Sequence, residues 1–172
     1  MSLVELLMAV VLLLVGMLGF TQSLISSVTT GATTREVGLA TQAARRTVAT
    51  LQSMPFDEVF ARFNADAADD PGGAGTAPGS GVIVPGLTLQ QGDPDGMVGE
   101  IVFPSTAAAP GILREDLADA ALGTPRDLNG DGAWDNADHS GDYRILPVIV
   151  RMRWRGKAGD ASVEFRTLLT DL

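Results

Sequence analysis

Residues 1–28 read MSLVELLMAVVLLLVGMLGFTQSLISSV, and Glu5 is the one charged side chain among them. A helix needs about 20 apolar residues to cross a bilayer, and this stretch is long enough. It lacks the basic start and the small-residue cleavage site of a secretory signal peptide. A carboxylate inside an apolar segment is costly and usually has a specific partner. We therefore predict that residues 1–28 form an apolar helix segment in which Glu5 has a particular role.

The next segment, residues 29–54, is predicted to continue the same helix with one apolar side. Apolar residues recur there at the three-and-four spacing of a helix face, at Val37, Ala40, Ala44, Val48 and Leu51. Pro55 then disfavours helical backbone angles at the preceding residue and ends the pattern. Such a helix is roughly 80 Å long at about 1.5 Å per residue. A domain of this size can cover only the amphipathic half, so we expect residues 1–28 to project.

Residues 55–172 are predicted to form one globular, β-rich domain. The clearest signal is a hairpin, because apolar and polar residues alternate over 148–155 and 163–169 with a turn at 156–160. The amphipathic half of the helix can cover the apolar face of this hairpin. Weaker candidates are a short helix at 56–63, a Gly- and Pro-rich loop at 64–81, strands at 82–84, 87–89 and 99–103, and a short helix at 112–122. This order predicts an α+β fold, in which a long N-terminal helix packs on a small antiparallel sheet.

The composition narrows the classes of function. The chain has 12 Lys and Arg against 21 Asp and Glu, a formal net charge of −9. Nucleic acid is not an expected partner, because phosphate binding needs a clustered cationic face. The sequence contains no cysteine, which excludes disulfides, thiolate metal sites and cysteine nucleophiles within it. A secreted domain without disulfides needs another staple, such as subunit contacts or a bound ion.

The segment Met1-Ser2-Leu3-Val4-Glu5-Leu6, with the apolar run behind it, resembles the processed N-terminus of type IV pilins, minor pilins and type II secretion pseudopilins. Members of this family carry an N-methylated hydrophobic first residue and a T/S-L-x-E-L/V pattern with glutamate at the fifth position. Met1 stands where Phe is commoner. The resemblance covers about 25 residues, and the Trp-ended strand, glycine turn and final strand are also similar to minor pilins. It implies that a leader is removed before Met1 and that Met1 is methylated.

The resemblance implies a structural subunit of a type IV pilus-like filament that serves adhesion, motility or secretion. Residues 1–28 would lie in the inner membrane before assembly and in the filament core afterwards, on the cell surface or in a periplasmic pseudopilus. The implied partners are identical or related subunits and the pilus assembly machinery. One alternative is a low-copy minor pilin or pseudopilin that primes assembly. An alternative from another class is a monomeric, membrane-anchored calcium-binding module.

Met1 and Glu5 are the predicted assembly residues. Subunits in a helical stack are displaced along its axis, so the Glu5 carboxylate can meet the α-amine of a neighbour. A buried charge pair of this kind specifies register more than it adds stability. The simpler alternative is a plain membrane anchor with a glutamate near the lipid headgroups.

Gly16 and Gly19 lie inside the apolar helix, where each costs about 1 kcal/mol relative to alanine. One interpretation is that the helix loosens around them when it packs in a filament. The other is that these small residues allow close approach between helices.

Residues 127–138 read DLNGDGAWDNAD and have the spacing of an EF-hand calcium loop. Oxygen-bearing side chains fall at loop positions 1, 3, 5, 9 and 12, with Gly at 6 and a backbone carbonyl at 7; Asp replaces the usual Glu at 12. The expected Ca²⁺ ligands are Asp127, Asn129, Asp131, the carbonyl of Ala133, Asp135 and Asp138. The loop resembles those of dockerins and calcium-stapled pilins. The alternative is a solvated turn rich in Asp and Asn.

No catalytic site is expected, so the chain is predicted not to be an enzyme. His139, Ser140 and Asp142 lie too close in sequence to form a relayed triad. Arg151, Arg153 and Arg155 alternate on one strand. They are interpreted as a solvated face or as a contact with acidic neighbouring subunits.

Overall fold

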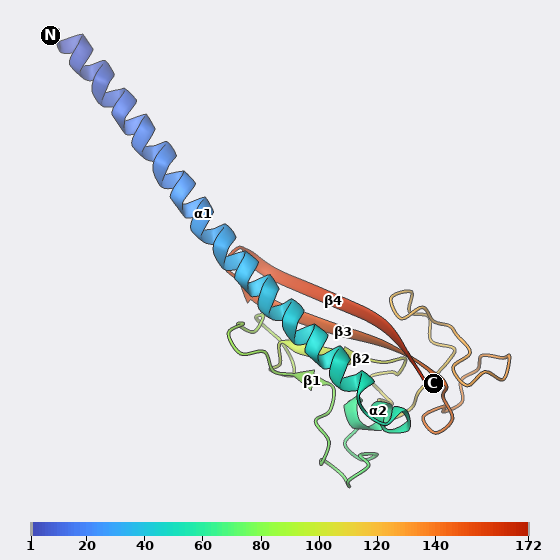
Figure 1. Ribbon diagram of the computed structural model, residues 1–172. Helices are drawn as coiled ribbons and strands as arrows, with labels where there is room; N and C mark the ends of the chain where they lie inside the picture. The colour runs from blue at the N-terminus through green and yellow to red at the C-terminus, as the bar shows by residue number, and fades with distance from the viewer. Residues whose placement is uncertain (1, 172) are drawn as a thin grey trace.

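The computed structural model describes residues 2–171. A single long helix, α1 (Leu3–Gln52), extends from a domain that contains a short helix, α2 (Phe56–Phe63), and a four-stranded antiparallel sheet. The strands lie in the order β1 (Gly81–Val82), β2 (Gly99–Val102), β3 (Ile145–Gly156) and β4 (Gly159–Thr170). The N-terminal half of α1 projects away from the domain (Figure 1). The predicted α+β fold, with a long apolar helix and a small antiparallel sheet, is confirmed.

The hairpin β3–β4 is the largest part of the sheet. Its strands pair from Ile145 with Thr170 to Gly156 with Gly159, which leaves Lys157 and Ala158 as a two-residue turn. Gly159 has a φ of 121°, an angle that side-chain-bearing residues rarely adopt and that suits a tight hairpin turn. The predicted alternation is confirmed on β3. The buried apolar residues of its helix-facing side are Val148, Val150, Met152 and Trp154.

The C-terminal half of α1 covers this apolar face. Ala40 and Ala44 are fully buried, and their small side chains let the helix backbone come close to the strands. At the hairpin turn, the Glu36 carboxylate accepts a hydrogen bond from the backbone N–H of Lys157 at 3.3 Å. At the opposite end of the hairpin, Leu51 lines a groove together with residues 168–171, which are the last residues of β4 and the residue after it. The helix therefore runs along the length of the hairpin.

A second layer of the core joins α2 to the loops. The rings of Phe60 and Phe103 meet edge to face with centroids 5.3 Å apart. The hydroxyl of Tyr143 donates a 2.6 Å hydrogen bond to the carbonyl of Phe56. Burial raises the pKa of Tyr143 to about 12. These contacts fix α2 against the segment that follows β2 and the segment that precedes β3.

Two predicted elements are wrong. Residues 87–89 are not a strand, because Gly86, with a φ of 90°, turns the chain. The one ladder-like contact is the hydrogen bond that the Thr88 carbonyl accepts from the N–H of Arg155 at 2.8 Å. Residues 112–122 are bends and turns instead of a helix. Their amides bond to distant carbonyls, as Arg114 does to Pro104 at 2.8 Å. Tertiary contacts therefore override the local helix propensity of this segment.

Replacing Leu51 by alanine tests the packing of helix on sheet. Leu51 is 1% exposed, so Leu51→Ala should lower the free energy of unfolding by about 2–5 kcal/mol through lost burial and a cavity. Leu14→Ala is the matched control, because Leu14 is 52% exposed and touches none of the domain. Urea denaturation of the full chain in detergent, monitored by tryptophan fluorescence, measures the free energy of unfolding of both variants. Equal effects of the two substitutions would contradict this account of the core.

Candidate functional site

The apolar half of α1 packs against no other part of residues 2–171. Every large hydrophobic side chain from Leu3 to Val28 is between 49% and 78% exposed. The helix contains a stretch long and apolar enough to cross a membrane, and that stretch is not buried against the domain. Gly16 and Gly19 lie within continuous helix, and a Cβ added at either would touch no other atom within 4 Å. Loosening or close approach at these glycines in an assembly stays a prediction.

Glu5 completes a hydrogen-bonded cap at the start of this helix. The Ser2 hydroxyl oxygen accepts a bond from the N–H of Glu5 at 3.3 Å, and the Glu5 carboxylate accepts one from the N–H of Ser2 at 2.9 Å. This reciprocal pair is a capping box, and its sequence signal is Ser followed three residues later by Glu. Sequence reasoning missed this local role. The predicted assembly role of Met1 lies outside the described residues.

The predicted calcium loop, residues 127–138, is curled by its own side chains. The Asp127 carboxylate accepts hydrogen bonds from the N–H groups of Gly130 (2.5 Å) and Gly132 (2.8 Å). Asn129 and Asp131 each accept a bond from the amide two residues ahead. The bond from Gly132, followed by those from other loop amides, holds the pKa of Asp127 below its usual value despite partial desolvation. Asp127 is therefore ionised at neutral pH.

Glu115, which sequence reasoning did not single out, organises the base of this loop. It is 1% exposed, and one carboxylate oxygen accepts the N–H of Leu128 at 2.5 Å and that of Asn129 at 3.3 Å. The other oxygen accepts the N–H of Asp135 at 3.4 Å. No sequence spacing links residue 115 to residues 128–135. A single buried carboxylate thus holds both ends of the loop together.

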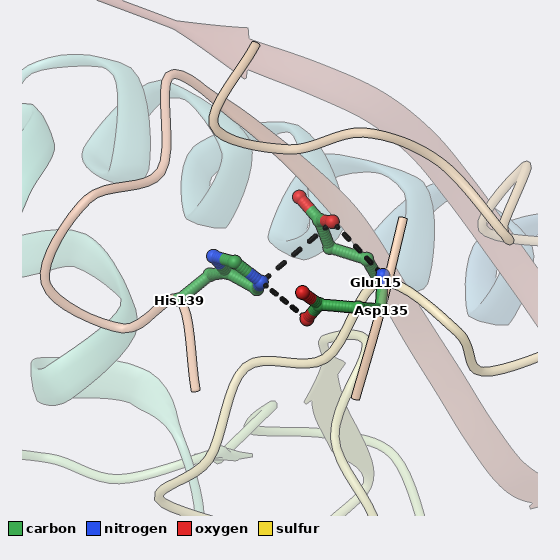
Figure 2. A group of neighbouring side chains, drawn as sticks. All are labelled: Glu115, Asp135 and His139. Atoms are coloured by element: carbon green, nitrogen blue, oxygen red, sulfur yellow. Dashed lines mark hydrogen bonds and ion pairs between the residues drawn. The ribbon is translucent and has the colours of Figure 1, made fainter. Parts of the chain in front are cut away.

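His139 lies buried among carboxylates at the same place. Its Nε2 is 3.2 Å from Asp135 Oδ1 and 3.6 Å from Glu115 Oε2, and its Nδ1 is 3.1 Å from Asp142 Oδ1. Figure 2 shows the imidazole pointing toward Glu115 and Asp135. The ring nitrogens thus face acids and not Ser140, an arrangement that gives no nucleophile–base pair. It suits an imidazolium held by three carboxylates.

The same residues form a candidate cation site. One ligand atom each from Glu115, Asp135 and His139 lie within 4.8 Å of one another. This set of oxygen and nitrogen ligands suits several divalent metals and is not specific to Ca²⁺, which prefers oxygen. Among the described residues, Asp135 is the one predicted calcium ligand in this group. Asp138 instead accepts the N–H groups of Leu113 (3.2 Å) and Ser140 (3.0 Å).

Comparison with protein-family profiles, with curated proteins and with solved structures gives no match to this chain.

The pKa of His139 predicts how stability depends on pH. Burial lowers this pKa, but the hydrogen bonds to Asp135 and Asp142 and the charge of Glu115 outweigh burial and raise it above 6.5. The stabilisation that protonated His139 contributes is complete below its unfolded-state pKa of about 6.5, and it is lost as the pH rises through the higher folded-state pKa. We expect the stability difference between the native chain and His139→Gln to shrink as the pH rises above 6.5 in the presence of a chelator. Urea titrations of the full chain in detergent measure it, and a difference that does not change with pH would contradict the arrangement.

Proposed function

We propose that this protein is a structural subunit of a type IV pilus-like filament. The observation that carries the proposal is the apolar half of α1, residues 3–28, which is fully helical and has no partner in its own chain. Burying one large apolar side chain stabilises by about 1.5–3 kcal/mol. A rod of such side chains needs either a lipid bilayer or other apolar rods around it. A bilayer before assembly and a bundle of subunits afterwards satisfy this need in turn.

Glu5 favours a bundle over a plain membrane anchor. In the isolated chain its carboxylate bonds to the N–H of Ser2, but no cation lies in residues 2–34. Once apolar helices pack around it, an unpaired carboxylate is strongly destabilising, so it needs a cation from a neighbouring subunit. Such a pair permits one axial position of a subunit against the next. The resemblance of Ser2–Leu6 to the pilin N-terminus supports the same reading.

The remaining parts of the proposal concern place and partners. The subunit lies in the inner membrane on α1 and is then moved by the assembly machinery into a surface filament or a periplasmic pseudopilus. Its neighbours are identical or related subunits, and the filament serves adhesion, motility or secretion. A minor subunit that primes assembly would have the same architecture. A monomeric anchored module is the competing class.

Substitutions at Glu5 distinguish a filament subunit from an anchor. Glu5→Gln keeps a residue that completes the capping box but removes the charge, and Glu5→Ala removes both. We expect either change to lower the yield of sheared filaments more than about tenfold, because a buried charge pair is lost. Ser2→Ala, which removes the cap alone, should retain filaments. Immunoblots of the sheared-filament fraction and of the membrane fraction measure the assembled and the membrane-bound protein.

The membrane fraction of every variant should be unchanged. Normal filaments from Glu5→Gln would contradict the proposed role of the charge, and an anchor alone predicts no effect of any of the three changes.

We further propose that residues 127–138 bind Ca²⁺ and staple the domain. Four carboxylates lie within this loop, at Asp127, Asp131, Asp135 and Asp138. Their one ion-pair partner among the described residues is His139, which is charged only when protonated. Gly130 and Gly132 have φ values of 81° and 90°, so the backbone is already tightly curled. An amide hydrogen bond leaves a carboxylate with free lone pairs for a metal. Asn129, the Ala133 carbonyl and these acids are the proposed ligands.

Calcium should raise the melting temperature of the full chain in detergent. A ligand present at about 100 times its Kd stabilises by about 2.7 kcal/mol, and a chelator should remove this gain. Asp127→Asn with Asp131→Asn should abolish the response to calcium. Asp160→Asn, at the distant hairpin turn, is the control and should respond normally. An identical melt with calcium and with chelator, together with no bound metal by mass spectrometry, would exclude the site.

A further inference from the structure

The exposed side of α1 within the domain carries arginines that have no acidic partner on their own chain. Arg35, Arg45 and Arg46 are exposed, and none of them forms an ion pair within residues 2–171. Arg45 and Arg46 border a shallow groove whose floor includes Gly38 and Ala49. Small residues at this floor let another surface approach the helix closely. We refer to this surface as the arginine face; its lining residues are Gly38, Thr41, Gln42, Arg45, Arg46 and Ala49.

A second surface has the opposite charge. Asp66, Asp70 and Asp95 line a hollow of about 240 Å³ between the loop after α2 and the segment before β2. Asp69 directly precedes Asp70 in the chain, and Asp93 lies two residues before Asp95. None of these five acids forms an ion pair in the described part of the chain. We refer to this surface as the acidic hollow.

Charge in the acidic hollow is compensated only in part by the rest of the chain. Burial raises the pKa of Asp69, the Asn64 side chain opposes this, and the charges of Asp66 and Asp70 raise it further. The positive charge of Arg153 partly offsets the negative charges of Asp93 and Asp95, but Arg153 forms its ion pair with Glu100, at 3.3 Å. A cation from outside the chain would therefore relieve repulsion there.

The two surfaces do not meet within one copy. The loop after α2 lies past the C-terminal end of α1, away from the projecting half (Figure 1), and the two surfaces share no lining residue. Residues 1–54 hold three arginines and two glutamates, so the acidic excess of the chain lies wholly in the rest. Two complementary patches at different places on one molecule make a heterologous contact, which repeats without closing when the rotation does not close a ring. A helical filament is the expected product of such a contact.

We propose that Arg45 and Arg46 of one subunit dock in the acidic hollow of a neighbouring copy. This inference depends on the proposed filament function and names the surfaces that its subunits use. A guanidinium presents donors in a planar fork that matches carboxylates, and the buried carboxylate of Asp70 is screened less than the exposed ones of Asp69 and Asp95. Complementary charges of this kind fix the register and direction of docking. The apolar halves of α1 supply the apolar surface that is buried between neighbouring subunits.

Reversal of charge on each surface tests the contact. Arg45→Glu with Arg46→Glu should lower the yield of sheared filaments about tenfold, since two pairs become repulsive. Asp69→Arg with Asp95→Arg, at exposed positions of the hollow, should do the same. The four changes together should restore filaments. Arg45→Lys with Arg46→Lys is the matched control that keeps the charge, and melting temperatures in detergent establish that each variant folds.

Cross-linking gives an independent readout, because the chain has no cysteine of its own. Ala49→Cys with Ala67→Cys, one on each surface, should yield disulfide-linked ladders in oxidised filaments. Ala49→Cys with Ser162→Cys, the latter exposed on β4, should not. Normal filaments that give no ladder and tolerate charge reversal would overturn the docking while leaving the filament function intact. A native chain that forms no filament at all would overturn both.

Discussion

The packing of α1 against the β3–β4 hairpin is the constraint on which the rest of the structure depends. Ala40, Ala44 and Leu51 supply the helix side of this contact, and Val150, Met152 and Trp154 supply the sheet side. Because a single helix contains both this buried face and the apolar rod before it, the domain cannot fold without also displaying the rod. The exposed apolar surface is thus a direct consequence of the fold. A partner outside the chain has to cover it.

The long-range architecture could be predicted from sequence because its signals are periodic. The apolar run, the three-and-four spacing from Ala40 to Leu51 and the strand alternation each extend over many residues, and Pro55 marks the end of the helix. The two-residue turn at Lys157–Ala158 falls inside the predicted turn region. Val37 belongs to the predicted face but is 39% exposed, since it lies where the helix leaves the domain.

The candidate site was less predictable because its contacts are not local. The spacing of Asp127 to Asp138 is visible in sequence, and His139 lies close in the chain to its acidic partners. Glu115, in contrast, reaches the loop amides and His139 from a distant segment. The same contacts displaced the expected helix at 112–122: a helix would have used the amides of Arg114 and Asp116 internally, whereas they bond to Pro104 and Asp135. Local propensity could not anticipate either outcome. The capping box of Ser2 and Glu5 is the opposite case, since its signal was present in the sequence and was not used.

The alignment of α1 with the hairpin has a mechanical consequence. Glu36 contacts the hairpin at its turn and Leu51 lies at the other end of the strands, so the helix and strands share one long axis. A force applied along the projecting rod is therefore directed parallel to this interface. It loads all the contacts between Glu36 and Leu51 at once, in shear, and does not peel them apart one by one. A chain built this way resists extraction of its helix from its own domain when the projecting rod is pulled.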